Sequence, residues 1–173
     1  SPIVPEKIYH IYNRGVNKQL LFINKSDWQF FYSKMRIYFQ PQHASLLGYC
    51  LMSNHYHLIV LINSQEFSSK VMQPFMLSYS KWFNKKYKRV GPLFQGPFQS
   101  KEIESEGSLL QLSKYIHLNP VKAKLVEKPE DWVYSSYQNY IAKEHGNFIK
   151  TDIILSLTTN SNLYQEFVLN NKE

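Results

Sequence analysis

Cysteine is almost absent from this chain of 173 residues: Cys50 is the only one, which excludes a disulfide within the molecule. Its neighbours are apolar, and we expect a small buried side chain in a protein from a reducing compartment. Long apolar runs are missing as well, because none reaches the roughly 18 residues that a membrane-spanning helix requires. The first residues lack the basic and then apolar pattern of a signal peptide. We therefore expect a cytoplasmic protein without a membrane partner.

Acidic residues are outnumbered, since 13 Asp and Glu stand against 20 Lys and Arg, and the formal net charge is +7. Aromatic residues make up 16% of the chain. Positive charge combined with aromatic rings suits a polyanion that offers flat bases for stacking, so nucleic acid is the natural partner. Composition alone does not establish this, because many small proteins are basic without binding nucleic acid.

The length and a hydrophobic content of 43% predict one domain with its own core. Alternating and apolar runs predict strands at residues 8–14, 45–52, 55–62 and 98–104. Helical spacing predicts helices at 26–39, capped by Ser26 or Asp27, at 72–87, and from 107 onward. This order is that of the split βαβ motif, so we expect an α+β, ferredoxin-like fold: an antiparallel sheet with helices packed on one face. We assign residues 7–126 to the core and 127–173 to a C-terminal extension with further helical elements, packed on it.

Two histidines, His55 and His57, stand at the beginning of the third predicted strand. Side chains two positions apart on a strand share a face, so the two imidazoles can bind one metal ion together. They can equally be hydrogen-bonded surface groups, and the pair alone leaves both interpretations open. We interpret His10, on the first predicted strand, as a sheet histidine rather than a ligand.

A polar line runs along the third predicted helix, where Gln111, Tyr115 and Asn119 follow one another at intervals of four. On its own this pattern is most simply a solvated helix face with a half-buried tyrosine. Pro120 disfavours helical geometry at the preceding residue, so we expect the helix to end at Asn119, where its side-chain oxygen could reach a metal. His117 lies on another face of the helix than Tyr115.

Taken together, these segments closely resemble the HUH single-tyrosine transposases of the IS200 type, particularly their REP-associated relatives. The resemblance covers roughly residues 8–140, and its motifs come in the family's order: YHIYNRG at 9–15, NHYHLIV at 54–60, GPLFQGPF at 91–98, KYIHLNPV at 114–121, and residues 132–137. Several motifs in one order are far more specific than any one of them. The chain beyond about residue 140 has no counterpart that we can assign.

The resemblance implies an enzyme that nicks single-stranded DNA near hairpins and joins it to a new end. His55 and His57 would bind Mg²⁺ or Mn²⁺, with Asn119 as the third protein ligand. Tyr115 would attack the scissile phosphate and form a 5′-phosphotyrosine link. Imidazoles are soft ligands for Mg²⁺, so Mn²⁺ or Zn²⁺ could bind more tightly in vitro. Family members act as monomers or as homodimers that exchange tyrosine helices, and nothing in the sequence decides between the two.

Most residues that we expect to contact DNA are basic, and the densest cluster lies at the end of the second predicted helix, near Trp82 and Tyr87. The complete set is Arg14, Lys81, Lys85, Lys86, Lys88, Arg89, Gln111 and Lys114. A solvated helix end is the alternative interpretation of the cluster.

Two other functions compete with strand transfer. The first is a non-catalytic ferredoxin-like module that binds single-stranded nucleic acid by stacking bases on aromatic residues of the sheet. The second is metal-dependent hydrolysis, which would release free 5′ phosphates and leave Tyr115 without a role. The joint presence of His55, His57, Tyr115 and Asn119 speaks against the first of these.

Overall fold

The computed structural model describes residues 2–142 and 146–170, and its four strands form one antiparallel sheet. The strands are β1 (Ile8–Arg14), β2 (Ala44–Leu51), β3 (His55–Ile62) and β4 (Gln99–Ile103), and they lie in the order β2-β3-β1-β4. The predicted strands agree with these bounds to within one residue. This order is that of the split βαβ motif, so the predicted fold class is confirmed.

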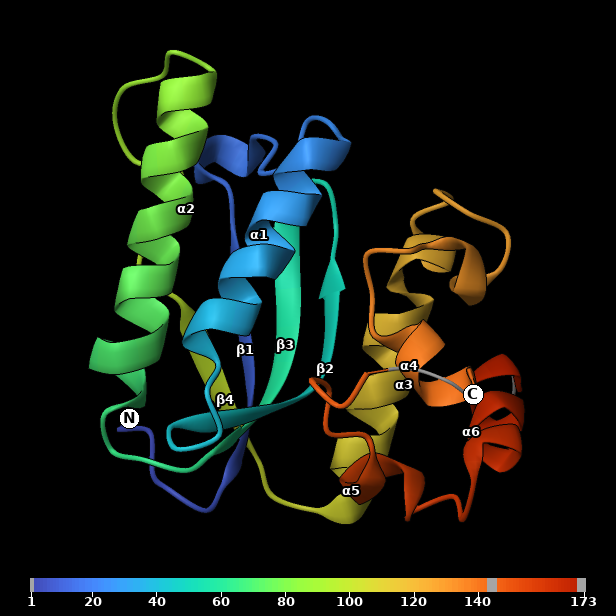
Figure 1. Ribbon diagram of the computed structural model, residues 1–173. Coiled ribbons are helices and arrows are strands. Elements are labelled where there is room, and N and C mark those ends of the chain that lie inside the picture. Colours follow the sequence, from blue (N-terminus) through green and yellow to red (C-terminus); the bar gives the residue numbers. More distant parts are fainter. Residues whose placement is uncertain (1, 143–145, 171–173) are drawn as a thin grey trace.

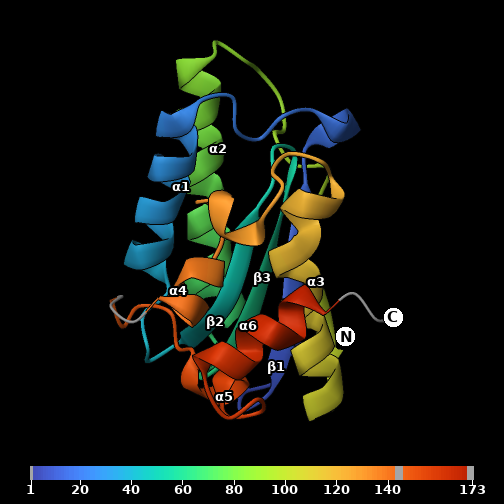
Figure 2. The ribbon, with the colours of Figure 1, turned by 90° about the vertical axis from the view of Figure 1, so that its right-hand side faces the viewer.

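Helices cover both faces of the sheet, and not one face alone as predicted, because α3 follows the split βαβ unit and packs on its second face (Figures 1 and 2). On one face lie α1 (Lys25–Tyr38) and α2 (Gln73–Lys86), the latter preceded by a π-helical turn at Ser68–Met72. On the opposite face lies α3 (Glu106–Lys122), and the C-terminal helices pack beside it: α4 (Tyr137–Ile141), α5 (Asp152–Leu155) and α6 (Ser161–Leu169). Single 3₁₀ turns occur at Val16–Lys18 and Pro129–Asp131. No helix of the described residues is long and apolar enough to cross a membrane.

The face under α1 and α2 is an aromatic core. Phe31 of α1 is fully buried, and its ring meets Tyr79 of α2 edge-on at 5.0 Å and lies 5.5 Å from the ring of Tyr56 on β3. Aromatic rings in such tilted and edge-to-face arrangements gain attraction beyond the area they bury. Because Tyr56 points into this core, His55 and His57 must point to the other face, toward α3.

A buried polar network ties α3 to the C-terminal extension. His117 of α3 forms hydrogen bonds at 2.8 Å with the hydroxyls of Tyr164 and Ser136, and Tyr164 also donates to Ser113. Burial lowers the pKa of His117 to about 3, so the ring is neutral: one ring nitrogen donates its N–H to one hydroxyl and the other nitrogen accepts from the second. The extension therefore holds the back of α3, and His117 faces away from Tyr115 as predicted.

Two predicted helix ends are wrong. The first helix begins at Lys25 with Asn24 as its N-cap, because the Asp27 carboxylate reaches back to the N–H groups of Ile23 and Asn24 and so lies inside the first turn. The third helix continues through Asn119 to Lys122 with Pro120 inside it. Pro120 is buried near the helix end, and this packing outweighs the local preference against helical geometry before proline.

The Asp27 carboxylate also joins α1 to the end of α2. Its side chain is fully buried and accepts hydrogen bonds from Lys86 Nζ at 2.7 Å and the Tyr87 hydroxyl at 2.6 Å. Burial by itself raises the pKa of Asp27, but hydrogen bonds from Lys86, Tyr87 and two backbone N–H groups outweigh it, so the pKa is lowered. The ionised carboxylate is thus a stabilising link between the two helices.

We predict that Asp27→Asn lowers the free energy of unfolding by about 2–4 kcal/mol at neutral pH, because a buried charged partner is removed from Lys86. Urea denaturation of both proteins measures the difference. The control is Asp152→Asn, whose exposed pair with Lys150 should contribute less than about 1 kcal/mol.

The same link predicts acid sensitivity. A carboxyl whose pKa is lowered by folding stabilises the protein above its ordinary pKa of 3.8 and loses that contribution as the pH falls through the folded value. The difference between wild type and Asp27→Asn should therefore shrink below about pH 4. A difference that stays constant with pH would show that the effect comes from packing and not from charge.

Candidate active site

The candidate site lies where β1 ends and β3 begins, on the face of the sheet that α3 covers. Gly15 closes β1 at this point: its N–H donates to the Asn54 carbonyl at 2.9 Å, and it bridges to Phe94. A Cβ at Gly15 would lie 2.2 Å from the carbonyl oxygen of Gln19, so only glycine fits here. The end of β1, the β2–β3 turn and the loop after α2 are thereby held together around one cleft.

The two predicted histidines share the face toward α3. His57 is 8% exposed, and its Nδ1 lies 2.9 Å from His10 Nε2, while its own Nε2 is buried without a hydrogen-bond partner among the described residues. His55 Nδ1 lies 2.8 Å from the Asn54 side-chain oxygen. Both rings are held through Nδ1, which leaves their Nε2 atoms for other contacts.

Tyr115 and Asn119 of α3 come to the same place. The Tyr115 ring stands edge-on to the His57 ring, with centroids 5.7 Å apart, and 47% of the residue is exposed. Asn119, one turn later, lies close enough to His55 to raise the pKa of that imidazole. The structure thus gathers in one chain all four residues that the sequence selected as nucleophile and metal ligands.

The histidines of this site are neutral in the absence of a bound cation. Burial, followed by the neighbouring His10 and His55, lowers the pKa of His57 to about 3. Burial and then the charge of Lys101 lower the pKa of His10 to about 4. Burial and then Arg14 also lower the pKa of His55, against an opposing hydrogen bond with Asn119. Neutral imidazoles carry the lone pair that a metal ion requires.

The donor set fits a divalent ion of intermediate softness. No group of three or more His, Cys, Asp or Glu that could hold a metal occurs within residues 2–142 and 146–170, so a third protein ligand would have to be an amide such as Asn119. The unpartnered, buried Nε2 of His57 is the kind of atom that a bound ion would satisfy. Two imidazoles and an amide oxygen suit Mn²⁺ better than Mg²⁺.

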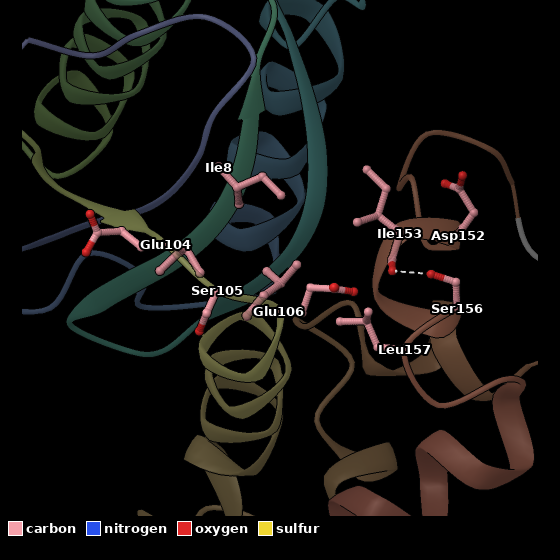
Figure 3. A pocket seen from close by; sticks show the side chains of 10 residues that line it. Ile8, Glu104, Ser105, Glu106, Asp152, Ile153, Ser156 and Leu157 are labelled. Atoms are coloured by element: carbon pink, nitrogen blue, oxygen red, sulfur yellow. Dashed lines mark hydrogen bonds between the residues drawn. The ribbon is translucent and has the colours of Figure 1, made fainter.

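The cleft in front of these residues has a volume of about 510 Å³ and is basic. It is lined by Tyr12, Asn13, Arg14, Lys18, Asn54, His55, Tyr56, His57, Gln95 and Tyr115. A different cleft of about 560 Å³ opens at the other end of α3, where Glu104, Glu106 and Asp152 line it (Figure 3). Carboxylates repel phosphate, so charge distinguishes the two clefts and favours the first for a nucleic acid.

The predicted DNA-binding residues fall into two groups. Arg14, Lys81, Lys85, Lys88 and Gln111 are exposed. The others are engaged within the protein: Lys86 with Asp27 at 2.7 Å, Arg89 with Asn84 and Gln19, and Lys114 with the carbonyl of Asn170 at 2.6 Å. Arg14 also donates to Gln95 at 2.6 Å, at the rim of the cleft. Contact with DNA stays a prediction for all eight.

Several residues that line or contact the site were not predicted from the sequence. Asn54, Lys18 and Gln95 line the cleft, and His10 contacts His57, although we had interpreted His10 as a sheet histidine only. One sequence feature could have indicated His10: in a sheet where the strands at 8–14 and 55–62 are neighbours, it lies on the same face as the histidine pair.

Comparison with known proteins identifies the family of this chain. The family model of IS200-like transposases matches residues 4–119, about two thirds of the chain, and the chain belongs to this family. A solved structure of a REP-associated tyrosine transposase bound to a REP hairpin has the same fold, with a TM-score of 0.65 and 17% identity. The match covers 85% of this chain and 90% of that one. None of the curated proteins matches.

Proposed function

We propose that this protein is a metal-dependent endonuclease and strand transferase for single-stranded DNA that forms a 5′-phosphotyrosine intermediate through Tyr115. One observation carries the proposal: the ring of Tyr115 stands beside His57, whose buried Nε2 has no hydrogen-bond partner among the described residues, while Asn119 from the next turn lies near His55. A solvated helix face would not require this convergence. Family membership supports a transposase, and the site supports this chemistry for it.

His55, His57 and Asn119 would hold the ion, Mn²⁺ or Mg²⁺. When bound, it would polarise the scissile phosphate and offset charge on the leaving 3′ oxygen. Tyr115 would be the nucleophile: its oxygen would bond to phosphorus as the bond to the 3′ oxygen breaks, its phenolic proton would leave to solvent through the exposed side of the ring, and the 3′ oxygen would take up a proton from solvent and leave as a 3′-hydroxyl. The 5′-phosphotyrosine link conserves the phosphodiester, so another 3′-hydroxyl can displace Tyr115 and reseal the strand.

The substrate that suits the site is single-stranded DNA next to a hairpin. Arg14 and Lys18 supply positive charge at the cleft, and the exposed Lys81, Lys85 and Lys88 extend it along α2. A hairpin is also what the structurally similar REP-associated transposase holds. The site is complete within one chain, which suits a monomer and equally a homodimer in which each chain keeps its own helix. An enzyme acting on cellular DNA suits the cytoplasmic location expected from the sequence.

Tyr115→Phe tests the nucleophile. The variant keeps the ring and its packing, so we expect unchanged stability and DNA affinity, no cleavage, and no covalent adduct with an oligonucleotide and Mn²⁺. Mass spectrometry of the digested wild-type adduct should place a 5′ phosphate on the peptide containing Tyr115. Tyr38→Phe, on α1 across the sheet, is the matched control and should cleave normally. Free 5′ phosphates without an adduct would indicate hydrolysis instead.

The double variant His55→Ala with His57→Ala tests the metal ligands. Both rings lie at the beginning of β3, so we expect a folded protein that still binds DNA but has lost both Mn²⁺ binding and cleavage. Calorimetric titration with Mn²⁺ and an oligonucleotide cleavage assay measure the two losses. Asn119→Ala should reduce Mn²⁺ binding and cleavage less than the double variant does, and His43→Ala should change neither quantity. Full cleavage by the double variant in the presence of a chelator would show that the pair is structural.

A triple variant with Gln at Lys81, Lys85 and Lys88 tests the DNA surface. If these lysines neutralise phosphates, the slope of log affinity against log salt for single-stranded DNA should fall by about 2. The matched control places Gln at Lys7, Lys70 and Lys150, which removes the same charge near the opposite end of the sheet. Equal slopes for the two triple variants in a fluorescence anisotropy titration would remove α2 from the proposed DNA surface.

A further inference from the structure

His10 lies beside the site but has no part in the chemistry described above. It stands on β1 opposite Ile59, while His57 stands opposite Tyr12, so the two histidines are diagonal neighbours on one face of the sheet. Their rings are stacked, with centroids 5.1 Å apart and planes 26° apart, and the Nε2 atom of His10 lies 2.9 Å from the Nδ1 atom of His57. This is a direct hydrogen bond between two imidazoles.

Such a bond can have only one of two proton arrangements. A neutral imidazole carries one N–H and one lone pair, so either His57 donates from Nδ1 or His10 donates from Nε2. In the second arrangement the proton of His57 sits on its Nε2, which is buried and has no acceptor among the described residues. In the first, the same Nε2 carries a lone pair. Buried N–H groups without an acceptor are rarer in proteins than buried lone pairs without a donor, and only the lone pair can be satisfied by a bound cation, so the first arrangement is favoured.

We propose that His10 is a positioning residue whose Nε2 accepts the Nδ1–H of His57 and thereby keeps the Nε2 lone pair of His57 directed into the cleft. The proposal rests on the proposed function for the statement that this lone pair binds a metal ion. Asn54 is placed to do the same for His55, since its side-chain oxygen lies 2.8 Å from His55 Nδ1. Both proposed ligands would then be oriented from behind by neutral acceptors.

An uncharged acceptor behind each proposed ligand affects the net charge of the site. Carboxylates often orient metal-bound histidines, and they add negative charge to the site. His10 and Asn54 add none, and the lining of the cleft within the described residues includes no carboxylate. A bound divalent ion would therefore keep its full charge for the phosphodiester, which is itself an anion.

Replacement of His10 by Gln and by Leu separates the hydrogen bond from packing. A Gln side-chain oxygen can occupy the place of Nε2 and accept the same proton, whereas Leu cannot. The first readout needs no metal: nitrogen chemical shifts of ¹⁵N-labelled histidine in the metal-free protein report which nitrogen of His57 is protonated. The second is calorimetric titration with Mn²⁺ alone, without DNA. His43→Leu is the control, because it removes an imidazole near the opposite end of the sheet.

We expect wild type and His10→Gln to show His57 protonated on Nδ1, and His10→Leu to lose this preference. The affinity for Mn²⁺ should fall by about 10–100-fold in His10→Leu, and His10→Gln should recover most of it. Protonation of His57 on Nε2 in the wild type would overturn the proposal even if no variant folded. So would a His10→Leu protein with unchanged shifts and unchanged affinity.

Failure of the proposed function gives a different result. A wild-type protein with the Nδ1–H form of His57 but neither Mn²⁺ binding nor a Tyr115 adduct would leave His10 as a positioning residue in a protein without this chemistry. A wild-type protein that forms the Tyr115 adduct but has His57 protonated on Nε2 would support the proposed function and contradict the positioning role of His10.

Discussion

The packing of α3 onto the histidine-bearing face of the sheet is the contact on which the site depends. Gly48 of β2 lies under this contact: a Cβ there would reach van der Waals distance of Ile116 Cδ1, at 3.7 Å, and would press against Ser136 Oγ, at 3.3 Å. From behind, His117 is bound by Ser136 and Tyr164, so the helix is held by the sheet on one side and by the extension on the other. A helix fixed at both sides cannot rotate freely, and Tyr115 is therefore held beside His57 before any substrate arrives.

Charge is distributed so that the proposed metal ligands, His55 and His57, stay neutral and positive groups stand around them. His55 and His57 have lowered pKa values chiefly because they are buried, and the groups oriented toward them, His10, Asn54 and Asn119, carry no negative charge. An acidic ligand would bind a cation more tightly but would repel a phosphodiester. Neutral ligands are weaker, and they leave the charge of the cation for the substrate.

The sequence predicted the strands well because β2 and β3 are continuous β-prone runs joined by the short Ser53-Asn54 turn, and the period of two along β3 places His55 and His57 on one face. It predicted the common side of Tyr115 and Asn119 from their spacing of four. It failed at Asn119 as a helix end, because burial of Pro120 is a property of the packed protein. The bond between His10 and His57 was missed for a related reason: it joins residues 47 positions apart, and only the pairing of β1 with β3, not a local pattern, places His10 on the face of the histidine pair.

The basic residues show why net charge alone overstates the surface available to a polyanion. Lys86 belongs to the densest cluster in the sequence, yet its ammonium group is bound to the buried Asp27 and lies over the rings of Trp82 and Tyr87. Arg89 is likewise bound to Asn84 and Gln19, next to the loop that closes the cleft. The hydrogen bonds of these two cations hold the end of α2 in place. The exposed lysines and Arg14 therefore extend from a fixed backbone. Cations in fixed positions can align a phosphate backbone, and alignment of the scissile phosphate with Tyr115 is what the proposed attack requires.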